Sequence, residues 1–145
     1  MEVTTYSFTD LAGSISHPTF GAYLFDGTGI GSVTISKATD RTAHDVAADG
    51  SVMVSKIAGN NGTVTIECQQ TSAIHKWLLA WFNVLWQLPT SEWASTSLTL
   101  RNSATGTRHI ISGVSPQKEP DTPYQSQGQR VTWNLMCAEI TNLPI

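Results

Sequence analysis

The sequence predicts a mainly β protein, an antiparallel β-barrel or sandwich of about six to seven strands with one α-helix packed on it. Three stretches alternate polar and apolar residues with a period of two, namely Ser32–Lys37, Ser51–Lys56 and Thr63–Glu67. An Asp-Gly pair precedes the second stretch and a Gly-Asn-Asn-Gly run precedes the third, a pattern typical of consecutive antiparallel strands joined by turns. A single segment, 72–88, has helical periodicity instead.

Composition indicates one domain, spanning 1–145, with a surface that carries little charge. A chain of 145 residues can bury a core without disulfides or metal. Charged residues make up 13% of it, against about a quarter in an average domain, which suits a protein much of whose surface contacts other protein. The net charge of −3 and the eight scattered Lys and Arg residues argue against a surface that binds the phosphates of nucleic acid. The first residues lack a basic region and an apolar run, so we expect no signal peptide and synthesis in the cytoplasm.

The N-terminal part is expected to hold a short strand followed by a long arm. Thr5–Phe8 alternates polar and aromatic residues, which predicts a first strand. Segment 11–28 contains Gly, Pro and Ser and predicts a long loop, of the kind that is usually functional. Four of its side chains are too apolar for a solvated loop, so we expect them to pack against a neighbouring subunit. They are Phe20, Tyr23, Leu24 and Phe25.

Segment 31–58 is expected to form an extended hairpin. Its two strands, from Gly31 to Ala38 and from Ser51 to Ala58, are predicted to pair, and 39–50 extends the hairpin beyond the body of the domain. By strict parity Met53 falls on the polar face of the second strand, which suggests a β-bulge or a different register. The other predicted segments are strands at 63–69, 97–102, 107–115 and 130–140 and a Pro- and Gln-rich loop at 116–129.

The predicted helix has two apolar faces. Ser72 is a plausible N-cap, and one stripe recurs at three- and four-residue steps: Ile74, Trp77, Leu78, Trp81, Leu85 and Leu88. This stripe can cover the sheet. The other side carries Leu79, Phe82 and Trp86 among polar residues, so we expect that a partner subunit covers it. The alternative is that the helix is buried on all sides within the core of its own subunit. The polar residues on that side make a membrane span a poor interpretation.

No motif in the sequence predicts catalysis, a metal or a cofactor. The four histidines are far apart and lack metal-ligand spacing. His44 with Asp40, Asp45 and Asp49 is the only titratable cluster, and turn chemistry explains its aspartates. The glycine-rich 27–31 run lacks the Lys and the helix of a phosphate loop, and no nucleophile elbow occurs. We therefore predict that the chain is not an enzyme.

The two cysteines, Cys68 and Cys137, occupy apolar positions of strand-like runs. Buried thiols are common in cores, so we expect both to be reduced core residues. A disulfide requires that the two strands be neighbours, which leaves their redox state open.

Several short runs resemble the tail tube proteins of contractile-tail bacteriophages. The similarity spans most of 6–83 and rests on these runs: Tyr6–Asp10, Val33–Ile35, Ala48–Met53, Gly62–Ile66 and Gln70–Ser72. The resemblance implies a structural subunit that assembles six to a ring, with rings stacked into a tube and DNA passing through the lumen without specific binding. It further implies a place in the virion tail, assembly in the host cytoplasm, and sheath, baseplate and terminator proteins as partners. Tail terminators and secretion-system tubes share the fold type and stay open as alternatives.

The same resemblance assigns roles to the predicted hairpin. Its long strands would join those of neighbours into a continuous inner barrel, the helix would sit outside, and the 11–28 arm would help to join rings. Alternation then places one set of side chains in the channel and the next in the wall. The expected lumen-facing residues are Thr34, Ser36, Ser51 and Ser55, with Val33, Ile35, Val52 and Val54 packed into the core. The expected inter-subunit residues are Phe20, Tyr23, Leu24, Phe25, Leu79, Phe82 and Trp86.

A monomeric β-sandwich that binds carbohydrate or protein is the alternative from another class. The chain has five tryptophans, which could serve as stacking platforms. Trp93 is the one expected to be exposed. A single exposed aromatic side chain offers little surface on which a ligand could stack. Self-association separates the two hypotheses, because a binding module should stay monomeric at high concentration.

Overall fold

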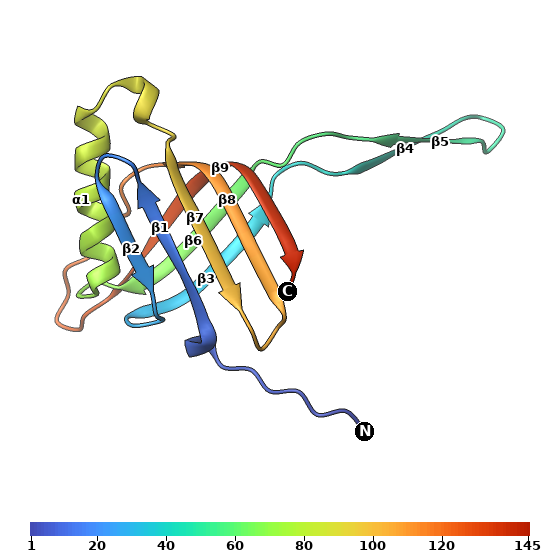
Figure 1. Ribbon diagram of the computed structural model, residues 1–145. Coiled ribbons are helices and arrows are strands. Elements are labelled where there is room, and N and C mark those ends of the chain that lie inside the picture. Colours follow the sequence, from blue (N-terminus) through green and yellow to red (C-terminus); the bar gives the residue numbers. More distant parts are fainter.

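The computed structural model describes residues 1–145 and contains a curled antiparallel sheet of seven strands, one helix and a separate two-stranded hairpin (Figure 1). The elements are η1 (Phe8–Asp10), β1 (Leu11–His17), β2 (Gly21–Phe25), β3 (Ile30–Lys37), β4 (Thr42–Val46), β5 (Val52–Lys56), β6 (Gly62–Gln69), α1 (Ala73–Gln87), η2 (Thr90–Glu92), β7 (Thr96–Asn102), β8 (Thr107–Pro116) and β9 (Arg130–Pro144). The predicted fold class, mainly β with one helix, is confirmed.

The sheet is an open half-barrel. Its strand order is β2-β1-β7-β8-β9-β6-β3, so β2 and β3 are its two edges and do not pair with each other. In the view of Figure 1 the helix lies at the left of the sheet, and the hairpin β4–β5 extends from the body to the right. The open edges keep a row of backbone N–H and C=O groups without a strand partner.

The segment 11–28 is a hairpin of the main sheet, so the predicted loop is wrong. β1 pairs with β2 on one side and with β7 on the other, with Ile15 opposite Tyr23 and opposite Leu98. Ile15 is fully buried and Phe25 is 3% exposed, because both point into the subunit's own core. Burial in the subunit therefore removes Phe25 from the expected contacts with a neighbour.

The N-terminal strand is also absent. Residues 1–7 have no regular structure, and Phe8–Asp10 forms one short 3₁₀ turn ahead of β1. Tyr6 is largely exposed. The aromatic residues whose alternation predicted this strand therefore have no sheet to pack against.

The predicted pairing within 31–58 is wrong as well. β3 pairs with β6, with Ile35 opposite Val64, while β5 pairs with β4. The buried face of β6 is continuous, and β3 contributes two half-buried residues, Val33 and Ile35, that pack against the same core. A strand that covers apolar area in this way is more stable beside β6 than beside the fully exposed β5.

The helix is present where the sequence predicts it. The Ser72 side chain accepts a hydrogen bond from the backbone N–H of His75 at 3.4 Å and caps the first turn. Ile74, Leu78, Trp81 and Leu85 are buried. The Trp81 indole N–H donates to the Thr96 hydroxyl at 2.9 Å.

The helix packs against strands from both halves of the curled sheet. On the β1–β2 side, the Trp77 ring lies 5.2 Å from Phe20 and 6.2 Å from Tyr23, between ring centroids. On the β9 side, the Trp133 indole N–H donates to His75 Nδ1 at 3.1 Å. Because α1 contacts β2 at one edge of the order and β6 and β9 in its other half, it closes one core of 19 buried residues.

Both cysteines are buried and reduced, and they lie far apart along the β6–β9 pair. Cys68 is opposite Val131, whereas Cys137 is opposite Gly62. Burial raises the pKa of both thiols, that of Cys137 to about 11.

The one α-helix, α1, lacks the length and the continuous apolar character that a membrane-spanning helix needs.

Candidate functional site: a hydroxyl-lined sheet face and a projecting hairpin

The outer face of the sheet is lined with uncharged polar side chains. Thr34 stands opposite Thr65, which stands opposite Asn134, and the Thr65 hydroxyl donates to the Asn134 side-chain oxygen at 3.0 Å. The row beside it runs from Ser36 through Thr63 to Met136, again in direct register. Directly opposite residues share a face of an antiparallel sheet, so these rows form one surface.

The hydroxyl surface continues across β1 and β7. The Ser14 and Thr99 hydroxyls are 3.4 Å apart, and those of Ser16 and Ser97 are 3.3 Å apart. Charges on this outer face are few. Glu67 and Arg130 neutralise each other in an ion pair of 3.1 Å, while Arg101 stands opposite Arg108 near the β7–β8 turn.

The predicted parity of β3 agrees with the structure. Thr34 and Ser36 are exposed, while Val33 and Ile35 are half-buried against the core. The role of Thr34 and Ser36 in lining a channel stays a prediction.

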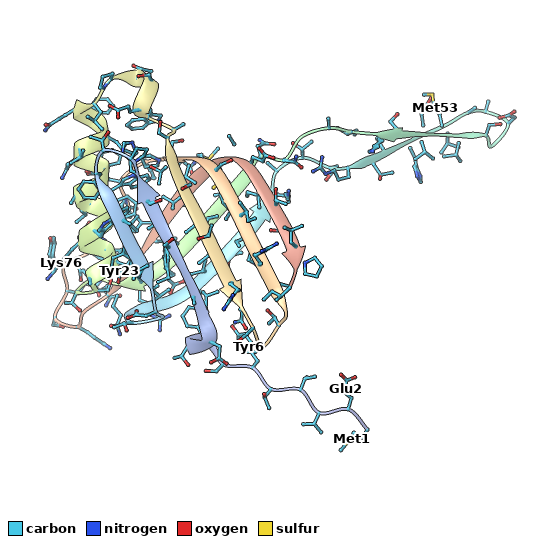
Figure 2. All side chains as sticks on the ribbon, in the orientation of Figure 1. Met1, Glu2, Tyr6, Tyr23, Met53 and Lys76 are labelled. Carbon is cyan, nitrogen blue, oxygen red and sulfur yellow. The ribbon has the colours of Figure 1, made fainter.

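The hairpin β4–β5 projects away from the sheet and has two different faces. On one face His44 stands opposite Val54, and Val46 stands opposite Val52. We call Val46, Val52 and Val54 the valine face. On the other face Asp45 is opposite Met53, and Ser55 is opposite Ala43. Figure 2 shows Met53 standing on this hairpin, well away from the sheet.

Two expectations for the second strand are corrected here. Val52 and Val54 do not enter a core, because they are 50% and 62% exposed and no other element packs on them. The pairing of Asp45 with Met53 is in regular register, so no bulge occurs. Ser55 lies on the face opposite the valines, as parity predicted, and Ser51 directly precedes β5 in the turn.

The tip of the hairpin is a defined turn. The backbone N–H of Ala47 donates to the Ser51 carbonyl at 2.8 Å, and that of Gly50 donates to the Ala47 carbonyl at 2.9 Å. Gly50 has φ +90°, which favours glycine. The Asp49 carboxylate accepts from the Ser51 N–H at 2.9 Å, and this bond lowers the Asp49 pKa.

The root of the hairpin is fastened to the sheet. The Ala38 N–H donates to the Asn61 carbonyl at 3.1 Å, and the Ile140 N–H donates to the Asn60 carbonyl at 2.8 Å. The Thr39 hydroxyl donates to the Asn61 side chain at 2.9 Å. Lys37 Nζ donates to the Ile140 carbonyl. These bonds tie both arms of the hairpin to the sheet, so its direction is set at the root.

The second face of the helix is only partly free. Leu79 and Phe82 are half-buried against the core, whereas Trp86 is 74% exposed. Trp93, the tryptophan expected to be exposed, is instead half-buried and packs edge-on against Phe82 and Trp86 at 6.3 and 6.1 Å. These three rings border an open hollow of about 560 Å³ together with Asn83, Gln117, Lys118 and Glu119.

The two buried histidines have structural roles. His17 Nδ1 accepts from the backbone N–H groups of Thr19 and Phe20 at 3.1 and 3.3 Å, and its Nε2 lies 3.0 Å from the Glu92 carbonyl. His75 accepts from Trp133, and burial lowers its pKa. Nowhere do three His, Cys, Asp or Glu side chains gather in a way that could hold a metal ion.

One protein-family model covers nearly the whole chain. The family model described as "Bacteriophage PhiTE tail tube protein" matches residues 3–143. The chain belongs to this phage tail tube family. The resemblance noted in the sequence is thereby confirmed, and the family is a structural one rather than a family of enzymes. No curated protein matches the sequence significantly.

Solved structures with a similar fold come from contractile injection systems. A chain of the anti-feeding prophage baseplate is 13% identical with a TM-score of 0.65, covering 99% of this tail tube family member and 98% of that chain. A chain of the extracellular contractile injection system "PVC sheath/tube terminator in extended state" is 10% identical with a TM-score of 0.60, covering 98% of each. The anti-feeding prophage cap, a tube-terminating cap, gives 11% identity and a TM-score of 0.59, covering 100% and 95%. At such identities the likeness establishes the fold.

Proposed function

We propose that this chain is the tail tube subunit of a phage, which self-assembles into hexameric rings that stack around a channel for genome delivery. The observation that carries the proposal is the hairpin. It projects from the body and exposes three valines on one face, with no surface of its own chain to cover them. An isolated two-stranded hairpin is marginally stable in water. A second copy of the subunit supplies the missing cover.

The sheet edges favour the same assembly. β2 and β3 are open edges of the half-barrel, and open edges are templates for pairing with another chain. Leu24 on β2 is 74% exposed, so it keeps its proposed place in a contact between subunits. Phe20 and Tyr23 stay in the proposed interface only through the parts of their rings that α1 leaves uncovered. Edge-to-edge pairing around a ring leaves no open strand edge that could start aggregation.

The hydroxyl-lined face supports the assignment of the channel. A wall rich in Lys and Arg would bind the phosphates of DNA by releasing counterions and would impede transit. The rows through Thr34 and Ser36 carry no charge. We assign this face to the lumen, with the polar face of the hairpin, Ser51 and Ser55, continuing it.

The helix side is assigned to the outside of the tube. Trp86, with Phe82 and Leu79 behind it, forms an exposed aromatic patch suited to another protein of the tail. Sheath, baseplate and terminator proteins are the proposed partners, in a virion tail assembled in the host cytoplasm. A terminator subunit is the second candidate, favoured by the fold shared with a tube-terminating cap.

Electron microscopy and sedimentation of the purified chain test the proposal. A tube subunit should form open-ended hollow tubes of uniform width whose length grows with concentration. A terminator should stop at single rings. Protein that stays monomeric at millimolar concentration contradicts both candidates and favours a binding module.

A further inference from the structure

The projecting hairpin carries opposite charges at its two ends. Its tip holds Asp45 and Asp49, and no Lys or Arg occurs between 42 and 55. Its root holds Lys37, Arg41 and Lys56, with Asp40 as the one carboxylate. All of these side chains are exposed. The hairpin therefore has an acidic end and a basic end.

Neither end finds its counter-charge within the chain. The only ion pair is that of Glu67 with Arg130, which lies on the main sheet. Arg41 hydrogen-bonds to the Ile57 carbonyl and to the Asn60 side chain, both uncharged. β4 is extended, so the turn at 47–50 lies roughly 20 Å from Arg41, and Asp45 lies roughly 13 Å from it. The acidic tip cannot fold back onto its own root.

The root also has a space beside it. A hollow of about 480 Å³ is bordered by Arg41 and Lys56 and by residues of the returning arm. Its other lining residues are Thr42, Ile57, Ala58, Gly59 and Asn60. The tip turn is narrow, because Ala47, Ala48 and Gly50 have small side chains or none.

We propose that the acidic tip of one copy docks into the basic hollow at the hairpin root of the next copy. The contact is head-to-tail, so each subunit gives one tip and receives one. Docking sets the turn with Asp49 against Arg41 and Lys56 and lays the valine face along the neighbour, while Asp45, on the opposite face, adds negative charge beside the contact. This inference rests on the proposed self-assembly and names the surfaces that meet in it.

A competing acceptor exists on the main sheet. Arg101 and Arg108 stand side by side there and border a smaller hollow of about 290 Å³. The root is favoured because its hollow is larger and because Thr42 and Lys56, which border it, stand on the same side of the hairpin as the valine face. A control variant at Arg101 and Arg108 separates the two acceptors.

Two charge-reversed variants test the contact. The tip variant carries Asp45→Lys and Asp49→Asn, the latter keeping a side-chain acceptor for the Ser51 N–H. The root variant carries Lys56→Glu and Arg41→Gln, the latter keeping a donor for the Ile57 carbonyl. The control variant carries Arg101→Gln and Arg108→Glu. Circular dichroism should show all three folded, because every altered side chain is exposed.

Each reversed variant alone should raise the critical concentration for assembly at least about tenfold, because like charges then meet in every contact. An equimolar mixture of the two should assemble near the wild-type concentration, since the basic tip of one meets the acidic root of the other. The control variant should assemble as the wild type does.

The outcomes separate this contact from the proposed function. If the wild type forms tubes and both reversed variants do so equally well, the tip-to-root contact is wrong while the tube assignment stands. If both fail and the mixture does not recover, the acceptor of the tip lies elsewhere, and a defect in the Arg101 and Arg108 control places it there. A wild-type protein that never assembles overturns the proposed function and this contact with it.

Discussion

Replacing the valine face of the hairpin by serine should weaken self-assembly without unfolding the subunit. Val46, Val52 and Val54 are 64%, 50% and 62% exposed. Full burial of a valine contributes about 1.5 kcal/mol, and half of that remains to be gained at Val52 and somewhat more than half at Val46 and Val54. Covering all three by a neighbour then contributes about 2.5 kcal/mol, which corresponds to about 70-fold in the association constant.

The assay is the critical concentration for tube formation, measured by sedimentation and checked by electron microscopy. The triple variant Val46→Ser, Val52→Ser, Val54→Ser should keep the wild-type urea unfolding transition, because these side chains lie outside the core. Met53→Ser is the matched control, since Met53 is 63% exposed on the opposite face. Its effect should stay within about threefold. A Met53→Ser defect as large as that of the triple variant refutes the assignment of the buried face.

Four further results are expected. Trp81→Ala should lower the free energy of unfolding in urea by about 3 to 5 kcal/mol, through a cavity and the loss of the bond to Thr96; a loss below about 1 kcal/mol contradicts the packing described. Burial lowers the pKa of His75 below its unfolded value, so the folded state binds fewer protons and stability should fall as pH drops through about 6.5. His75→Gln should flatten that fall, and an unchanged slope in urea titrations would exclude His75 as its source. Trp86→Asp should leave folding intact and impair binding to another tail protein in pull-down assays, whereas normal binding removes the aromatic patch from that role. Thr34→Cys in assembled tubes should react with small thiol reagents and resist bulky ones, and equal labelling by both places this face outside.

The helix and the long strands could be predicted because their side-chain period matches their burial. All buried residues of α1 except His75 lie on the predicted stripe, and β6 alternates buried and half-buried residues as far as Cys68. Such a period depends only on which residues face the core, so it can be recognised in the sequence without knowing which strands pair with each other.

The hairpin β1–β2 could not be predicted for a local reason. Its inward positions include Gly13 and His17, which do not read as apolar, although His17 is 2% exposed. A Cβ on Gly13 would lie 1.9 Å from the Thr99 carbonyl oxygen, so close strand packing requires this glycine. The sequence pattern therefore resembles a loop where the chain forms two strands.

Strand pairing and the site were harder to predict than the strands themselves. Alternation predicts which face of 51–56 is polar but not which strand lies beside it, because every strand offers the same backbone groups. The parity of Ser55 and Val54 was right, whereas the burial of Val54 was wrong, because it is 62% exposed and no strand of the chain covers that face. The charge reversal along the hairpin could be seen only once its tip and root were located.

In the proposed tube, the hydroxyl rows of the sheet form the wall of the channel. A serine or threonine hydroxyl rotates and can present either a donor or an acceptor. The pairs Ser14–Thr99 and Ser16–Ser97 can therefore exchange bonds with water in either sense. A wall of this kind holds a hydration layer without preferring one sign of charge. Polymers of opposite charge would slide along the same water film, and the width of the passage would select among them.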